Sequence, residues 1–205
     1  MGPPKSFTLW AAMPIARSFL LPLLVLLVLL APAQAAEVAV HVSRNGDVFN
    51  VEASAEFDGT VARTWQVLTD YGRLAEFVPD LQSSRVVSRD GNQAVVEQKG
   101  EARVLFFSYP IDVRLAITEH PHERVVSRAV SGNFREMRGA YSLEAGQGRV
   151  VLRYTGRMVP DFYVPLLIGT LALRHNVETS FRALVEEIER QQAQPAAPAG
   201  VSGKQ

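Results

Sequence analysis

A single long segment with helical periodicity lies near the C-terminus, and it follows a chain that otherwise alternates with the period of strands. Between Leu166 and Ile188 apolar residues recur in steps of three and four, which places them on one face of a helix expected over 165–190. That helix is about 39 Å long at about 1.5 Å per residue. The strands before it form a sheet with one apolar face, and this helix is the only expected element long enough to cover that face.

Period-two alternation of apolar and polar residues marks most of the chain between residues 38 and 158. Asn45-Gly46 and Asp90-Gly91 are two-residue turns typical of hairpins. Ser108-Tyr109-Pro110 is expected to separate two neighbouring strands. The pattern predicts strands over 38–43, 49–57, 85–89, 94–98, 102–107, 111–119, 125–130, 135–143 and 150–158.

Two short helices are expected early in the domain. Asp58 or Thr60 can cap the first, and Asp70 is expected to cap the second, Tyr71–Phe77, which Pro79 ends. The order of elements predicts an α+β fold: a curved antiparallel sheet wrapped around the long C-terminal helix, with two short helices after the first strand. Such a sheet can enclose an apolar cavity.

The first 35 residues have the features of a signal peptide. Arg17 precedes a run of about a dozen apolar residues, Phe19–Leu30, which is shorter than the roughly 20 that span a bilayer. Ala33-Gln34-Ala35 offers a cleavage site, so we expect a secreted or periplasmic protein. Retention of the segment as an anchor is the alternative. The folded domain is expected over 36–192, followed by a disordered tail over 193–205.

Composition narrows the chemistry. The chain has no cysteine, which excludes disulfides, thiolate metal sites and cysteine nucleophiles. Without Lys5 and Arg17, 19 basic residues face 21 acidic ones, a net charge of −2, so no long-range field attracts nucleic acid. His120 and His122 lack a set of carboxylates to complete a metal site. We expect no metal and no cofactor, and the sequence identifies no catalytic residue, which favours a binding protein over an enzyme.

Short motifs in a fixed order add a family resemblance. They are VARTWQVLTDY at 61–71, FVPDL at 77–81, YVPLL at 163–167, Arg174-His175 and FRAL at 181–184. Over residues 51–190 the chain resembles the START-like (SRPBCC) helix-grip superfamily, within it the polyketide cyclase/dehydrase and coenzyme Q-binding subgroup. The resemblance implies a small hydrophobic ligand, such as a lipid or quinone, held between sheet and helix. A cyclase or dehydratase-like enzyme and an envelope protein-interaction module are the alternatives.

Nine residues are candidates for lining that cavity. A regular strand places Arg138 and Tyr141 on opposite faces, so both line it only if a bulge intervenes. Trp65 is also explained as a core residue. The apolar stretch Phe162–Leu173 fits either the buried start of the long helix or a surface for transient membrane contact beside the cavity entrance. The full set of candidates is Trp65, Phe77, Phe106, Tyr109, Arg138, Tyr141, Leu166, Thr170 and Leu173.

Overall fold

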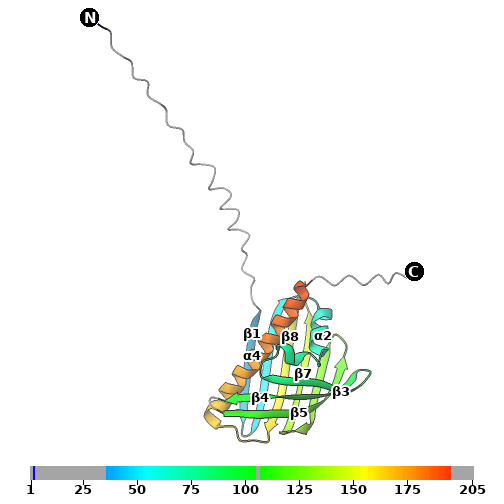
Figure 1. Ribbon diagram of the computed structural model, residues 1–205, viewed down its shortest axis with the longest axis vertical. Helices are drawn as coiled ribbons and strands as arrows, with labels where there is room; N and C mark the ends of the chain where they lie inside the picture. Colours follow the sequence, from blue (N-terminus) through cyan, green and yellow to red (C-terminus); the bar gives the residue numbers. More distant parts are fainter. Residues whose placement is uncertain (1, 3–35, 105–106, 195–205) are drawn as a thin grey trace. The chain divides into compact units, whose positions relative to one another are not determined.

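Eight strands form one antiparallel sheet in the order β1-β2-β8-β7-β6-β5-β4-β3 (Figure 1). The computed structural model describes Gly2 and residues 36–104 and 107–194. The expected signal peptide, the end of the tail and Phe106 lie outside these residues. The strands are β1 (Glu37–Asn45), β2 (Val48–Asp58), β3 (Leu81–Asp90), β4 (Gln93–Val104), β5 (Phe107–His120), β6 (Arg124–Gly132), β7 (Phe134–Ala145) and β8 (Arg149–Pro160).

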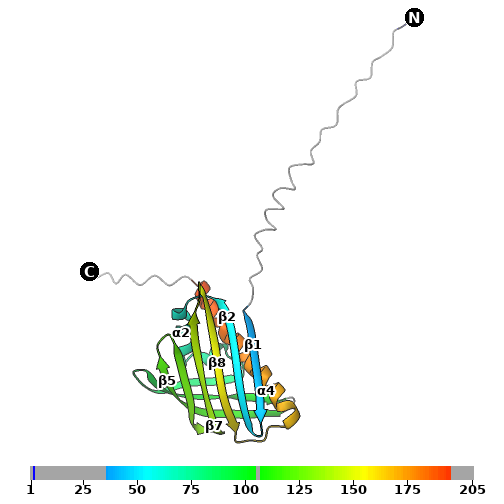
Figure 2. The same cartoon turned by 180° about the vertical axis from the view of Figure 1, so that it is seen from behind.

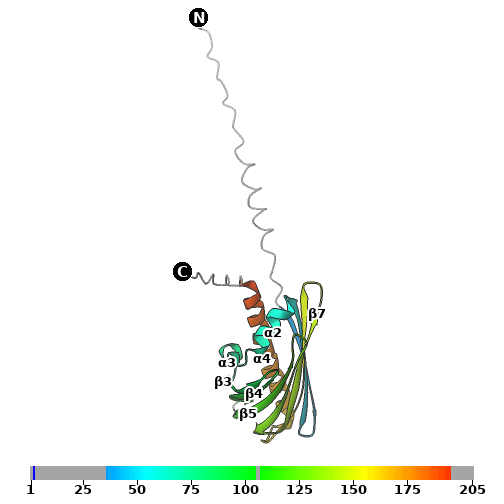
Figure 3. The ribbon, with the colours of Figure 1, turned by 90° about the vertical axis from the view of Figure 1, so that its right-hand side faces the viewer.

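Three helices lie on one face of this sheet, which curves around them (Figure 3). They are α2 (Val61–Thr69), α3 (Leu74–Phe77) and α4 (Leu166–Ala193). α4 packs against β1, β2 and β4 and also contacts α2 and α3. Figure 2 shows the sheet from its other face. The arrangement confirms the expected α+β helix-grip fold, with the short helices following β2.

The core lies between the sheet and the C-terminal half of α4. Phe57 of β2 and Leu152 of β8 are buried on the face of the sheet toward α4, and alternate residues of each strand share that face. From α4, Val185 and Ile188 complete the same cluster, with Ile188 fully inaccessible to solvent. Burial of these apolar side chains provides the main stabilisation of the fold.

Several element bounds differ from the sequence-based expectation. The strands expected over 94–98 and 102–107 form the single strand β4, and β3 begins at Leu81 rather than at residue 85. Pro110 lies inside β5, opposite Glu101, so the expected break at 108–110 is wrong. Pro110 is tolerated in β5 because the pairing of β5 with β6 ends at Val113. The N–H that proline lacks is therefore not needed for a hydrogen bond to β6. α3 begins only at Leu74, and α4 runs on to Ala193.

Capping also differs from expectation in one place. Thr60 caps α2 as expected, and its side chain accepts a hydrogen bond from the backbone N–H of Arg63 at 3.2 Å. Asp70 ends α2 and does not cap α3, whose preceding residue is Arg73.

The connection between α2 and α3 is held to the sheet by a buried carboxylate. The Tyr71 hydroxyl donates to Glu119 of β5 at 2.9 Å, and Arg89 of β3 forms an ion pair with Glu119 at 3.1 Å. Burial and the hydrogen bond to Glu119 raise the pKa of Tyr71 well above its usual range. This anchor explains why Tyr71 stands outside α3, since its side chain is directed to the sheet.

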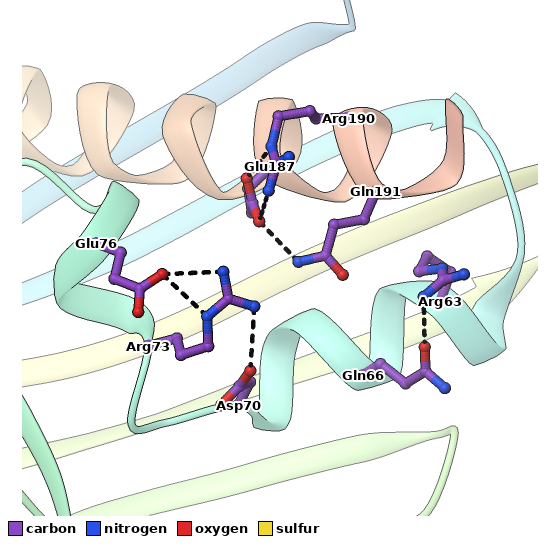
Figure 4. A network of polar contacts seen from close by, with 8 residues as sticks. All are labelled: Arg63, Gln66, Asp70, Arg73, Glu76, Glu187, Arg190 and Gln191. Carbon is purple, nitrogen blue, oxygen red and sulfur yellow. Dashed lines mark hydrogen bonds and ion pairs between the residues drawn. The ribbon is translucent and has the colours of Figure 1, made fainter. Parts of the chain in front are cut away.

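Polar pairs lie where the three helices meet (Figure 4). Arg73 pairs with Glu76 at 2.9 Å, and on α4 the buried Glu187 accepts from Arg190 and Gln191, each at 2.7 Å. The hydrogen bond from Arg190 lowers the pKa of Glu187. These contacts give the buried carboxylate of Glu187 hydrogen-bond partners at the edge of the core.

The packing of α4 is tested by truncating one buried and one exposed side chain of the same helix. Ile188→Ala is expected to lower the free energy of unfolding by about 2–5 kcal/mol, since it leaves a cavity in the core. Leu171→Ala removes a side chain that is 69% exposed and is expected to change stability by less than about 0.5 kcal/mol. Urea unfolding measures both, and equal losses would contradict the described face of α4.

Candidate functional site

The inner face of the sheet is wider than the helix that covers it. Eight strands spaced about 4.8 Å apart span about 34 Å, whereas a helix with its side chains is about 10–12 Å wide. Curvature of the sheet and the short helices close part of the difference. A cavity of about 350 Å³ remains between α4, the segment from α3 to the start of β3, and strands β4, β5, β7 and β8.

Apolar side chains dominate the wall of this cavity. α4 contributes residues at steps of three and four, the periodicity of a single helix face. Lys99 and Glu101 of β4 also line the cavity. Each is held in an ion pair, Lys99 with Asp112 at 3.2 Å and Glu101 with Arg103 at 3.7 Å. The apolar lining consists of Leu74, Val78, Pro79, Leu81, Ala102, Ile111, Val113, Phe134, Met137, Met158, Leu173, Val177, Phe181 and Leu184.

Two tyrosines provide the aromatic polar groups of the wall. Tyr141 of β7 lies directly opposite Tyr154 of β8, with ring centroids 4.7 Å apart. Phe181 of α4 stacks on Tyr141, with ring centroids 6.4 Å apart and planes inclined by 8°. Neither tyrosine hydroxyl has a hydrogen-bond partner among the described residues, and both side chains line the cavity. The two hydroxyls can therefore serve a ligand.

A pair of glycines makes room for Tyr154. Gly139 and Gly156 are also directly opposite each other, one step along the same face of the sheet from the tyrosines. A Cβ atom on Gly139 would lie 2.6 Å from the Tyr154 hydroxyl oxygen, and one on Gly156 would lie 2.5 Å from it. The phenol of Tyr154 therefore packs directly on the backbone of the two glycines. Any larger residue at either position would clash with it.

Burial raises the pKa of both phenols. It raises the pKa of Tyr154 from its ordinary value of 10 to about 12. The pKa of Tyr141 is raised further by burial, with a smaller contribution from Tyr154 beside it. At neutral pH each hydroxyl is a neutral group that can donate one hydrogen bond. The two hydroxyls can thus offer hydrogen bonds to a ligand oxygen without adding charge to the wall.

Only part of the predicted set comes together at this cavity. Tyr141 and Leu173 line it. Trp65 is buried in the core, 5.6 Å from the ring of His122, and Phe77 packs against the same core. Tyr109 stacks on Phe162 with ring centroids 5.0 Å apart, outside the cavity wall.

The remaining candidates lie elsewhere for reasons of strand and helix phase. Arg138 faces the opposite side of the sheet, because the bulge in β7 falls between Phe134 and Glu136 and leaves Arg138 and Tyr141 on alternate faces. Its side chain is exposed and pairs with Glu136 at 3.3 Å. Leu166 is 71% exposed at the start of α4, and Thr170 is half-buried outside the lining.

Tyr154 is the main cavity-lining residue that sequence reasoning missed. Its signal is a mirrored pattern: Gly139-Ala140-Tyr141 on one strand and Tyr154-Thr155-Gly156 on the next. In an antiparallel hairpin, such a pair of triplets brings tyrosine opposite tyrosine and glycine opposite glycine once the register is known.

Comparison with known proteins gives the family and the fold. The family described as "Polyketide cyclase / dehydrase and lipid transport" matches residues 58–188. No curated protein matches the chain significantly in sequence. Among the described residues, no three His, Cys, Asp or Glu side chains are grouped to hold a metal ion, and no helix has the length and apolar character needed to cross a bilayer.

Several solved structures share the fold at low sequence identity. A STAR-related lipid transfer protein from Xanthomonas axonopodis is 12% identical, with 76% of this chain and 99% of that one covered and a TM-score of 0.61. The Zhui aromatase/cyclase from Streptomyces sp. R1128 is 17% identical, with 70% and 95% covered and a TM-score of 0.57. A START superfamily protein from Mycobacterium smegmatis is 14% identical, with 69% and 98% covered and a TM-score of 0.58.

The buried tyrosines predict how stability depends on pH. A phenol whose pKa is raised in the folded state contributes stability that is complete below pH 10, the ordinary pKa, and is lost as the pH rises toward about 12. Each such group lowers the free energy of unfolding by at most about 1.4 kcal/mol per pH unit in that range. Chemical unfolding of the protein and of Tyr154→Phe between these pH values measures the difference, and the variant is expected to lose stability less steeply. Identical slopes would show that Tyr154 is not shielded.

Proposed function

This chain belongs to the polyketide cyclase / dehydrase and lipid transport family, and we propose that it binds and carries one small, neutral, apolar molecule in the cavity beneath α4. The observation that carries the proposal is the composition of the cavity wall: apolar side chains surround two protonated phenols that have no partner among the described residues. This combination suits a molecule with a largely hydrocarbon body and an oxygen acceptor.

The size of the cavity limits the ligand class. Its volume of about 350 Å³ is near the lower end of the roughly 300–1,000 Å³ of pockets that hold drug-sized ligands. A single ring system or a short chain fits such a space. A lipid with two long acyl chains would have to leave most of its length outside.

The polar groups favour a carbonyl-bearing ligand. Burial of an uncompensated charge is very costly, and Lys99 and Glu101, which line the cavity, are each already held in an ion pair, which favours a neutral guest. The hydroxyls of Tyr141 and Tyr154 lie on adjacent strands and offer two donors on one wall. A quinone or an aromatic ketone would pack its rings against the apolar wall and accept hydrogen bonds from the hydroxyls through its oxygen atoms.

The same hydroxyls favour carriage over catalysis. General acid–base catalysis is most effective when the pKa of the group is near the working pH, and burial moves both phenols away from neutrality. One structural relative is named a lipid transfer protein and another an aromatase/cyclase. Of these two activities, the tyrosine pair supports transfer.

Exposed apolar residues at the start of α4 suggest where the ligand enters. Tyr163, Leu166 and Leu171 are each about 70% exposed, and Leu173 on the following turn lines the cavity. Exposed apolar residues near a binding site are typical of a surface that contacts a partner or a membrane. The proposal includes brief contact of this surface with a bilayer during transfer.

The carrier hypothesis is tested first by native mass spectrometry of the protein purified from its own cells. A discrete added mass that disappears on denaturation is the expected result, because a cavity of this kind retains an apolar guest in water. The released molecule identifies the cargo. A mass equal to that of the bare chain in every preparation would argue against a carrier.

Recognition of an oxygen acceptor is tested with two probes of similar shape. Naphthoquinone carries two carbonyl groups and naphthalene carries none. Tyr154→Phe is expected to weaken naphthoquinone binding by about five- to tenfold, the worth of one hydrogen bond, and to leave naphthalene binding unchanged. Tyr109→Phe, which changes a tyrosine outside the cavity, is the matched control. If both probes lose affinity equally, the hydroxyl is not the recognition element.

Export of the carrier rests on the sequence of residues 1–35. The protein isolated from the producing cells is expected to begin at Ala36, because Ala33-Gln34-Ala35 supplies the small residues that a signal peptidase requires. Intact-mass measurement of the cell fractions tests this. Full-length protein found only in the membrane fraction would instead indicate an anchor.

A further inference from the structure

The outer face of the sheet, turned away from α4, carries a row of three arginines. Arg128 of β6 lies directly opposite Arg138 of β7, which in turn lies directly opposite Arg157 of β8. Asn50 of β2 continues the row beyond Arg157. This outer face is turned toward the viewer in Figure 2.

Placing like charges directly opposite each other on neighbouring strands is destabilising. Another row on the same sheet shows the usual solution. There, Glu97 stands between Arg85 and Arg114 with ion-pair distances of 2.9 Å to each, so the charges alternate across β3, β4 and β5. The row on β6, β7 and β8 lacks this alternation and keeps three positive charges side by side.

The acidic residues around the row do not balance it. Glu136 alone serves two of the arginines, 3.3 Å from Arg138 and 3.1 Å from Arg157. Within the residues that the structure describes, Arg128 and the neighbouring Arg124 form no ion pair. The row therefore has unused capacity for anionic oxygen atoms.

A recess lies beside these arginines. It has a volume of about 350 Å³ and is open to solvent, with Arg124, Arg138 and Arg157 around small residues that include Ala140 and Thr155. The small side chains keep the recess open, and the Thr155 hydroxyl and the Asn50 amide add hydrogen-bond donors to it. The recess lies on the other side of the sheet from the tyrosine-lined cavity.

We propose that this recess and the arginine row form a second site that binds phosphate groups. Strands are spaced about 4.8 Å apart, so the three guanidinium groups cover about 10 Å, which suits two neighbouring phosphates better than one. The planar, forked guanidinium matches phosphate oxygens in pairs. The phosphates come from either a soluble diphosphate or the headgroups of anionic lipids, and the site is independent of the ligand in the cavity.

Calorimetric titration with inorganic pyrophosphate at low ionic strength tests the site. Arg138→Gln, in the centre of the row, is expected to weaken binding by about tenfold or more. Glu136→Gln is expected to strengthen binding severalfold, because it removes the carboxylate that competes for Arg138 and Arg157. Arg153→Gln is the matched control: Arg153 is an exposed arginine of β8, paired with Glu144 at 3.5 Å, and its loss is expected to leave binding unchanged.

Co-sedimentation with phosphatidylglycerol vesicles distinguishes the two sources of phosphate. Binding of pyrophosphate that depends on Arg138 supports a soluble ligand. Binding of vesicles alone, with the same dependence on Arg138, supports lipid headgroups. Absence of binding to both, equal binding by Arg138→Gln, or an equal loss in Arg153→Gln would overturn the proposal. Naphthoquinone binding by Arg138→Gln is expected to be normal, so failure of this site and failure of the carrier hypothesis are separable.

Discussion

The mismatch in width between one helix and an eight-stranded sheet is the constraint on which this structure depends. α4 covers β1 and β2 closely and buries Val185 and Ile188 against them and their neighbours. The other strands must curve toward α4 to shield their apolar side chains from water. α2 and α3 close one end, held to β5 by the hydrogen bond between Tyr71 and Glu119. The space that remains is the cavity, so the site follows from how the core is covered.

Small residues keep that space from filling. Gly139 and Gly156 have no side chains beneath Tyr154, so its ring packs on their backbone. Tyr141 and Tyr154 then add two hydrogen-bond donors to a largely apolar wall. Both phenols are neutral at neutral pH, and burial raises their pKa further from it. Fixed, neutral donors on a largely apolar wall suit the oxygen-bearing apolar guest that we propose and offer little for acid–base chemistry, which favours carriage over catalysis.

Periodicity predicted the fold well because it reports which residues share a face. It gave the strands, the short helices and α4, and the motif resemblance agreed with the family that matches residues 58–188. It does not report register, so Tyr154 was missed. The regular-strand expectation that Arg138 and Tyr141 lie on opposite faces holds, because the β7 bulge falls between Phe134 and Glu136, before both residues. Leu166 has the phase of the buried face of α4, yet it lies at the start of the helix, where it is exposed. Pro110 joined β5 because its neighbour β6 ends before it.

The central claim is that an apolar guest with an oxygen acceptor occupies the cavity. NMR spectra of the methionine methyl groups test it most directly. The chain has four methionines, two of them at positions 1 and 13, and the other two, Met137 and Met158, both line the cavity. In protein labelled at methionine methyls, addition of naphthoquinone is predicted to shift both of these signals together and to saturate at one equivalent. Signals that stay in place while the quinone binds would put the binding site elsewhere and contradict the account.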